Sequence, residues 1–98
     1  MSRWRCAMES EALLEVKNKY GLHARASTRL AQLAQKFRSS IWISRTDEGQ
    51  EIDGKSILGI LTLGAERGMS VKVRCAGEDA ADALKAIHDL FRKNFDEE

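Results

Sequence analysis

A histidine and an arginine stand two residues apart in the stretch GLHARAS, residues 21–27. The ring of His23 can act as a nucleophile and form a covalent intermediate, and the guanidinium of Arg25 suits phosphate oxygens. A helical pattern begins at Ala24, and a helix start offers unpaired N–H groups and a positive dipole to an anion. His23 and Arg25 are therefore candidates for accepting and holding a phosphoryl group. From these residues alone, the alternative is a surface histidine beside a helix cap.

A second stretch, GQEIDGKS at residues 49–56, fits the G-x-x-x-x-G-K-S pattern of nucleotide hydrolases. That loop needs a buried strand before its first glycine, a helix that starts at Lys-Ser, and an acidic strand for magnesium. Here Gly49 falls in a predicted hairpin turn, and Ile52 places a strand inside the loop. Glu51 and Asp53 would put negative charge beside a triphosphate. We therefore reject the nucleotide site and expect Ser56 to cap a helix.

The elements that position these residues follow from hydrophobic periodicity. Alternation predicts strands within residues 11–18, 39–46, 50–53 and 69–76, and helical spacing predicts helices over residues 24–37, 56–63 and 77–95. The order is β-α-β-β-α-β-α. Strands of alternating polarity have one solvated face. We expect an α+β fold, an open-faced β-sandwich with a four-stranded, mainly antiparallel sheet and three helices on one side.

The short helix after Ser56 has two apolar sides at 100° per residue. Ile60 and Leu63 share one side and can face the core, whereas Ile57, Leu58 and Leu61 cluster on the other. Such a helix is either fully buried or docks a partner.

Composition narrows the class of protein. The 98 residues carry a net charge of +1, which argues against a general grip on nucleic acid. No apolar run has the length of a membrane span, and the N-terminus is not a secretory signal. Cys6 and Cys75 form neither a disulfide framework nor a metal spacing with His23 or His88. We expect one cytoplasmic domain at residues 11–98 after a flexible leader at residues 1–10, with a buried Cys75, a structural His88, and no metal, cofactor or membrane.

Three segments in this order resemble the HPr family of phosphocarrier proteins in the bacterial phosphoenolpyruvate-dependent phosphotransferase system: GLHARAS, DGKSILG at residues 53–59 and TLGAERG at residues 62–68. The resemblance covers about residues 11–95. It implies a carrier, not an enzyme, in which Enzyme I phosphorylates Nδ1 of His23 and an EIIA domain receives the group. Arg25 would support the phosphohistidine. Ile57, Leu58 and Leu61 would join Arg29 in one partner-binding surface, and the carrier would be a monomer.

The same resemblance implies that Ser56 is a target of an HPr kinase/phosphorylase. A phosphate there would add about −1.5 to −2 charges beside the apolar side of the short helix. One departure keeps a second function open. Ala26 stands where many sugar-branch relatives have proline, and alanine there also occurs in nitrogen-branch carriers. The alternative is a nitrogen-branch or mainly regulatory HPr-like module that controls partner proteins by its phosphorylation state.

Overall fold

The computed structural model describes residues 9–96, which form four strands, three α-helices and a short 3-10 turn. In chain order these are β1 (Glu9–Glu15), α1 (Ala24–Ala34), β2 (Ser40–Arg45), β3 (Ile52–Asp53), α2 (Ile57–Leu63), β4 (Ser70–Ala76), α3 (Ala80–Arg92) and η2 (Asn94–Asp96). The predicted order of strands and helices is confirmed. No helix within residues 9–96 is long and apolar enough to cross a membrane.

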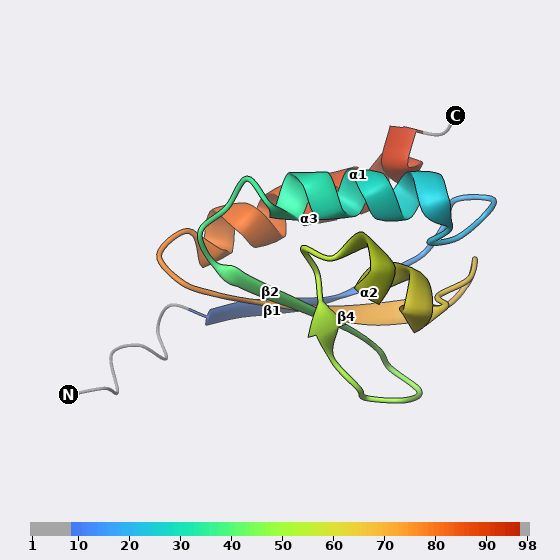
Figure 1. The fold of residues 1–98 in the computed structure, drawn as a ribbon, viewed down its shortest axis with the longest axis horizontal. Coiled ribbons are helices and arrows are strands. Elements are labelled where there is room, and N and C mark those ends of the chain that lie inside the picture. Colours follow the sequence, from blue (N-terminus) through green and yellow to red (C-terminus); the bar gives the residue numbers. More distant parts are fainter. Residues whose placement is uncertain (1–8, 97–98) are drawn as a thin grey trace.

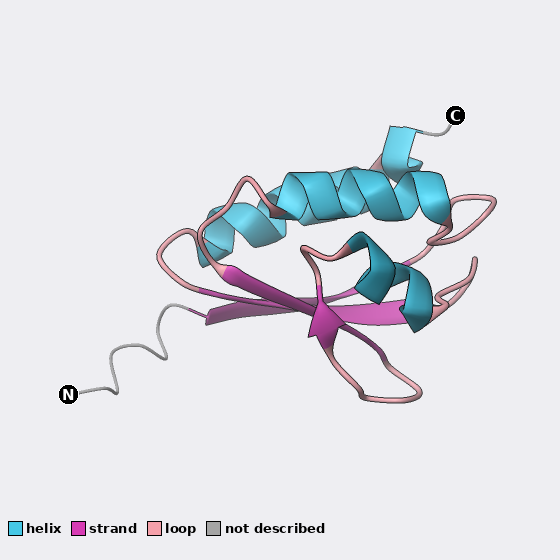
Figure 2. Ribbon diagram, viewed as in Figure 1, coloured by secondary structure: helices cyan, strands magenta, loops and turns pink. Residues whose placement is uncertain are grey.

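The strands form one sheet in the order β1-β4-β2-β3, and every neighbouring pair is antiparallel. Helices α1 and α3 lie over one face of this sheet (Figure 1). Helix α2 packs against α1 and against the β2–β3 hairpin. Figure 2 shows the two long helices on one side of the sheet and leaves its other face without a helix, so the open-faced sandwich predicted from the alternating strands is confirmed.

The core lies between the sheet and the helices. Alternate residues of the strands point into it, as the polarity pattern requires; buried examples are Leu14, Ile41, Ile43, Val71, Val73 and Cys75. The helices contribute both small and large apolar residues to the core; buried examples are Ala26, Leu30, Ala34, Ala83, Ile87 and Phe91. Burial raises the pKa of the Cys75 thiol to about 11, in agreement with the buried cysteine expected from the pattern.

Helix α1 ends at Ala34, three residues before the end predicted from the apolar spacing. The carboxylate of Asp79 explains the early stop, because it accepts hydrogen bonds from the backbone N–H groups of Arg38 and Ser39, each at 2.9 Å. The Ser39 hydroxyl donates to the same carboxylate. The chain must leave the helix to reach these bonds. They lower the pKa of Asp79 to about 2, the Ser39 hydroxyl being the largest cause.

Helix α3 also stops early, at Arg92 rather than at Phe95. Asn94, Phe95 and Asp96 adopt left-handed backbone angles, with φ of 56°, 57° and 60°. This turn places the Phe95 ring 4.8 Å from the ring of Phe91, and Phe95 is fully buried. Burial of an aromatic side chain compensates for a conformation that costs L-residues roughly 1–2 kcal/mol each.

Strand β1 begins inside the predicted leader. Glu9 pairs with Ala76 and Ser10 pairs with Cys75, so a boundary after Ser10 would cut the strand. The rest of the predicted leader, including Cys6, lies outside the described residues.

Candidate functional site

His23 occupies the N-cap position of α1, where its ring is exposed to solvent. Its backbone carbonyl accepts a hydrogen bond from the N–H of Ser27 at 2.8 Å, but its side chain forms no capping hydrogen bond. The ring is therefore available to a molecule approaching from solvent. The first-turn N–H groups of α1, which lack carbonyl acceptors within the helix, lie beside it.

The segment before His23 is fixed by its packing on the loop that follows α2. Gly21 has a φ of +67°, and a Cβ atom at this position would lie 2.8 Å from the carbonyl oxygen of Ala65. The N–H of Leu22 donates to that same carbonyl at 2.9 Å, and the Leu22 carbonyl accepts from the buried Ser27 hydroxyl at 2.8 Å. Only glycine tolerates both the positive φ and the close approach of the Ala65 carbonyl at position 21. The contact between Gly21 and Ala65 therefore fixes the position of His23.

Arg25 shares a surface concavity with His23, together with Tyr20 and Ala24. Arg25 is exposed, and none of the ion pairs found within residues 9–96 includes it. The structure thus brings together the imidazole and the guanidinium selected from the sequence. Tyr20 was missed, because its position before a glycine carries no chemical signal in the sequence.

Arg29 lies one turn further along α1. Its guanidinium is 3.5 Å from the carboxylate of Asp96 in η2, and both side chains are about half-exposed. This partner was not expected from the sequence, since the left-handed turn that brings Asp96 to α1 has no periodic signature. Arg29 faces solvent beside the same surface as Arg25 and Thr28.

Ser56 caps α2, as predicted. Its hydroxyl oxygen accepts a hydrogen bond from the N–H of Gly59 at 3.0 Å, and Gly64, which has a φ of 68°, is the C-cap after Leu63. Ile60 and Leu63 are buried on one side of the helix. Ile57, Leu58 and Leu61 are 39%, 70% and 38% exposed, and we call these three residues the α2 patch. The two-sided pattern is therefore confirmed.

The α2 patch reaches the histidine. A second concavity is lined by Leu61 from the patch, by His23 and Leu22, and by Ala65 and Glu66 of the loop after α2. His23 therefore lines two concavities, one that it shares with Leu61 and one that it shares with Tyr20 and Arg25.

The nucleotide-loop pattern does not form a phosphate cradle. Strand β3 lies inside it. The ammonium of Lys55 donates to the carbonyl of Phe37 at 2.8 Å, and the carbonyl of Lys55 accepts from Gln35 at 2.9 Å. Lys55 therefore ties α2 to the end of α1, which agrees with the rejection made from the sequence.

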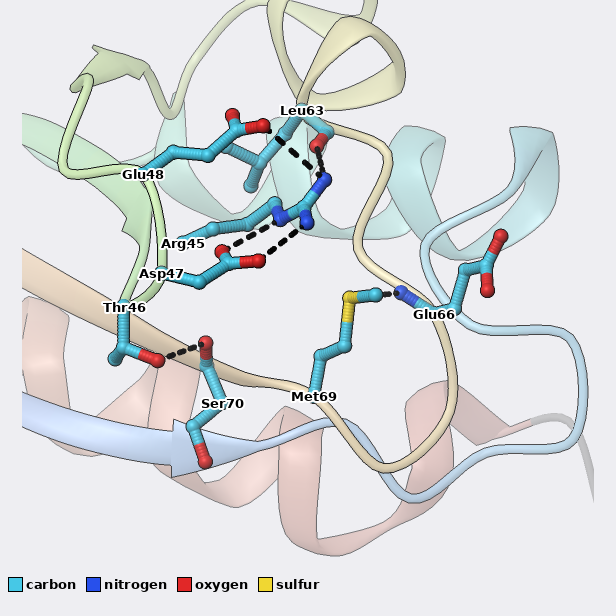
Figure 3. A network of polar contacts seen from close by, with 8 residues as sticks. All are labelled: Arg45, Thr46, Asp47, Glu48, Leu63, Glu66, Met69 and Ser70. Carbon is cyan, nitrogen blue, oxygen red and sulfur yellow. Dashed lines mark hydrogen bonds and ion pairs between the residues drawn. The ribbon is translucent and has the colours of Figure 1, made fainter.

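A polar network around Arg45 fixes the other end of α2 (Figure 3). Arg45 Nη2 and Nε lie 2.6 and 3.0 Å from the two carboxylate oxygens of Asp47, and Arg45 Nη1 donates to the Leu63 carbonyl at 3.4 Å. The hydrogen bond from Arg45 lowers the pKa of Asp47. This network holds the hairpin on the C-terminal end of α2, next to the loop that contacts Leu22. Neither the ion pair of Arg45 with Asp47 nor the contact of Arg45 with the Leu63 carbonyl was predicted from the sequence.

Comparisons with known proteins agree with this geometry. Residues 10–93 match the family described as the PTS HPr component phosphorylation site. The chain is 42% identical to phosphocarrier protein HPr of Xylella fastidiosa over 85 residues, which are 87% of this chain and 93% of that protein. It is 34% identical to phosphocarrier protein NPr of Escherichia coli over 91 residues, 93% of this chain and all of that protein.

A crystal structure of HPr from Thermoanaerobacter tengcongensis superposes with a TM-score of 0.86 at 42% identity, covering 91% of this chain and 98% of that one. The family match spans both the histidine loop and the α2 segment. The chain therefore belongs to the HPr family of phosphocarriers of the phosphotransferase system.

Proposed function

We propose that His23 is the phosphoryl-carrying residue, accepting the group from phosphorylated Enzyme I and passing it to a histidine of an EIIA domain. The observation that carries this proposal is an exposed imidazole at the start of an eleven-residue helix, in one concavity with an arginine. A ring nitrogen, Nδ1 by the family resemblance, attacks phosphorus as the bond from phosphorus to the donor breaks. In the second transfer, the histidine of the EIIA domain attacks phosphorus as the bond from phosphorus to His23 breaks.

Arg25 and the first turn of α1 stabilise the phosphoryl group in this proposal. The group adds negative charge at a helix N-terminus, where the dipole and the first-turn N–H groups favour anions. Arg25 has no ion-pair partner within residues 9–96, so its guanidinium can turn toward the phosphoryl oxygens without breaking a salt bridge. Because the site is open to solvent, it holds the group without enclosing it, as a relay requires.

The α2 patch and Arg29 serve as the docking surface for these partners. A phosphoryl group passes directly between two proteins only if their surfaces meet around the reacting atoms. Leu61 shares a concavity with His23, and the other two patch residues extend from it along α2. Apolar residues exposed together in this way are typical of protein interfaces.

Ser56 is the regulatory phosphorylation site in this proposal. Its hydroxyl already lies at a helix N-terminus, where a phosphate is electrostatically favourable, so modification preserves α2. The modification would place about −1.5 to −2 charges beside the α2 patch. An acidic partner would then be repelled, and phosphoryl transfer at His23 would slow.

The test uses Enzyme I and labelled phosphoenolpyruvate with three forms of the protein: wild type, His23→Ala and His88→Ala. His88 is the matched control, since it is an exposed histidine on the surface of α3. We expect an acid-labile phosphate on the wild type and on His88→Ala and none on His23→Ala. Labelling of His23→Ala at the wild-type level would contradict the proposal.

A nitrogen-branch or mainly regulatory carrier is the second candidate, favoured by the match to NPr over 93% of the chain and by Ala26. Transfer from sugar-branch and nitrogen-branch Enzyme I, measured side by side, separates the branches. Faster transfer from the nitrogen-branch donor would support this candidate. A regulatory role predicts that Ser56→Asp changes binding to a partner, and unchanged binding to every partner would count against it.

A further inference from the structure

We infer that Tyr20 is a partner-docking residue in the concavity that it shares with His23 and Arg25. The inference rests on the proposed relay through His23 and extends its docking surface to a region that the sequence did not indicate. The occupant is the phosphoryl-donor protein, which would place an apolar side chain on the Tyr20 ring and a carboxylate close to Lys19 and Arg25.

The turn that carries Tyr20 is fixed in position. The N–H of Gly21 donates to the carbonyl of Asn18 at 3.2 Å, and the Asn18 side-chain amide donates back to the carbonyl of Gly21 at 2.7 Å. Gly21 in turn packs against Ala65 too closely to admit a Cβ atom. A turn held at both ends presents its side chain in a defined place, so a partner that binds Tyr20 has little turn motion to arrest.

Tyr20 is 61% exposed, so the folded core does not account for an aromatic residue at this position. Its ring lines a concavity of about 450 Å³ that also includes His23, Ala24 and Arg25. Tyrosine offers a large, stiff contact area and is enriched among residues that dominate binding energy at protein interfaces.

Charge around Tyr20 defines the chemistry of the occupant. The ammonium of Lys19 lies 5.4 Å from the centre of the Tyr20 ring, and Arg25 lines the same concavity. These cations suit a carboxylate of the donor, since complementary charges at an interface speed encounter and fix orientation. Leu61 lines the second concavity to which His23 contributes. A donor that contacts both Tyr20 and Leu61 would cover both concavities that His23 lines, and so would bring its own reactive group to the imidazole.

The experiment measures steady-state transfer from phosphorylated Enzyme I to wild type, Tyr20→Ala, Tyr20→Phe and Leu13→Ala. Leu13 is the matched control, because it is 67% exposed but lies on the open face of the sheet, opposite its buried neighbour Leu14. Tyr20 and Leu13 are both exposed, and circular dichroism verifies that each variant folds.

We expect Tyr20→Ala to raise KM roughly 5- to 30-fold, the effect of truncating an interface residue that contributes measurably to binding, with kcat unchanged. Tyr20→Phe keeps the ring and should stay within about threefold of wild type, as should Leu13→Ala. Lys19→Gln should raise KM at low salt and lose this effect as salt screens the charge. Spontaneous hydrolysis of the phosphorylated protein should be the same in wild type and Tyr20→Ala.

An unchanged KM for Tyr20→Ala would overturn the inference, and so would a lower kcat at constant KM or faster hydrolysis, each of which would mean that Tyr20 acts on the phosphoryl group. An unchanged KM for Lys19→Gln at low salt would overturn the acidic character of the occupant. These failures are distinct from failure of the relay itself, which is recognised by labelling of His23→Ala.

Discussion

Replacing Ser56 separates its structural role from its electrostatic one. The change Ser56→Ala removes the hydrogen bond from the N–H of Gly59 to the Ser56 hydroxyl, 3.0 Å long, that begins α2. Loss of such a cap costs about 1 kcal/mol. Because α2 has only seven residues, its first turn is more than half of the helix. For a domain of this size, about 1 kcal/mol lowers the melting temperature by roughly 4–8 °C.

Ser56→Asp retains a capping oxygen and adds a negative charge where the helix dipole favours one. We therefore expect its free energy of unfolding to stay within about 0.5 kcal/mol of wild type. The rates of phosphoryl transfer should rank the two variants in the opposite order to their stabilities. Ser56→Asp should transfer more slowly than wild type, because its charge lies next to the α2 patch, while Ser56→Ala should transfer at nearly the wild-type rate at temperatures where it is folded.

Urea denaturation followed by circular dichroism gives the first quantity, and transfer from Enzyme I gives the second. Equal losses of stability in the two variants would refute the capping argument, because aspartate would then not replace the serine oxygen. Wild-type transfer by Ser56→Asp would refute the idea that charge at this helix start repels partners.

Three further predictions concern the fold around the site. Ile60→Ala should lower the free energy of unfolding by about 2–5 kcal/mol in urea denaturation. Leu58→Ala, at a side chain that is 70% exposed, should change this free energy by less than about 0.5 kcal/mol and should raise KM for Enzyme I. Equal losses of stability in the two variants would contradict a helix with one buried and one exposed apolar side. Gly21→Ala places a Cβ atom 2.8 Å from the Ala65 carbonyl at a φ of +67°, so it should cost at least roughly 1–2 kcal/mol and slow the labelling of His23, and wild-type stability would contradict this packing. Since the pKa of Asp79 is lowered to about 2, its stabilising contribution is complete above its ordinary pKa of about 4 and is lost as pH falls toward 2. Asp79→Asn should therefore be less stable at pH 7, and its free energy of unfolding in urea should depend less on pH between pH 2 and 5. An unchanged pH dependence in this variant would mean that Asp79 does not cause the loss of stability in acid.

Hydrophobic spacing correctly predicted the features that depend on the geometry of a single helix or strand. Ile60 and Leu63 are buried and Leu58 is exposed because each side chain's direction follows from helical geometry alone. His23 and Arg25 could be selected as candidates for a related reason, since a helix start, a glycine turn and two side chains suited to phosphoryl chemistry all lie within one short stretch.

Contacts between distant segments could not be predicted in this way. The bonds of Asp79 to Arg38 and Ser39 join residues 40 and 41 positions apart, and they decide where α1 ends. The helical spacing in the sequence continues to Phe95, but helix α3 ends at Arg92. Phe95 reaches the core through the left-handed turn that follows. Polar and left-handed features of this kind depend on which elements meet, and periodicity carries no information about that.

The most direct test of the relay is to locate the phosphoryl group in the wild-type protein. Brief reaction with Enzyme I and phosphoenolpyruvate, followed by digestion at alkaline pH and fragmentation mass spectrometry, assigns the modified side chain. The account predicts a phosphohistidine at His23 that disappears when an EIIA domain is added. Phosphate on His88 or on Ser56, with His23 unmodified, would contradict it.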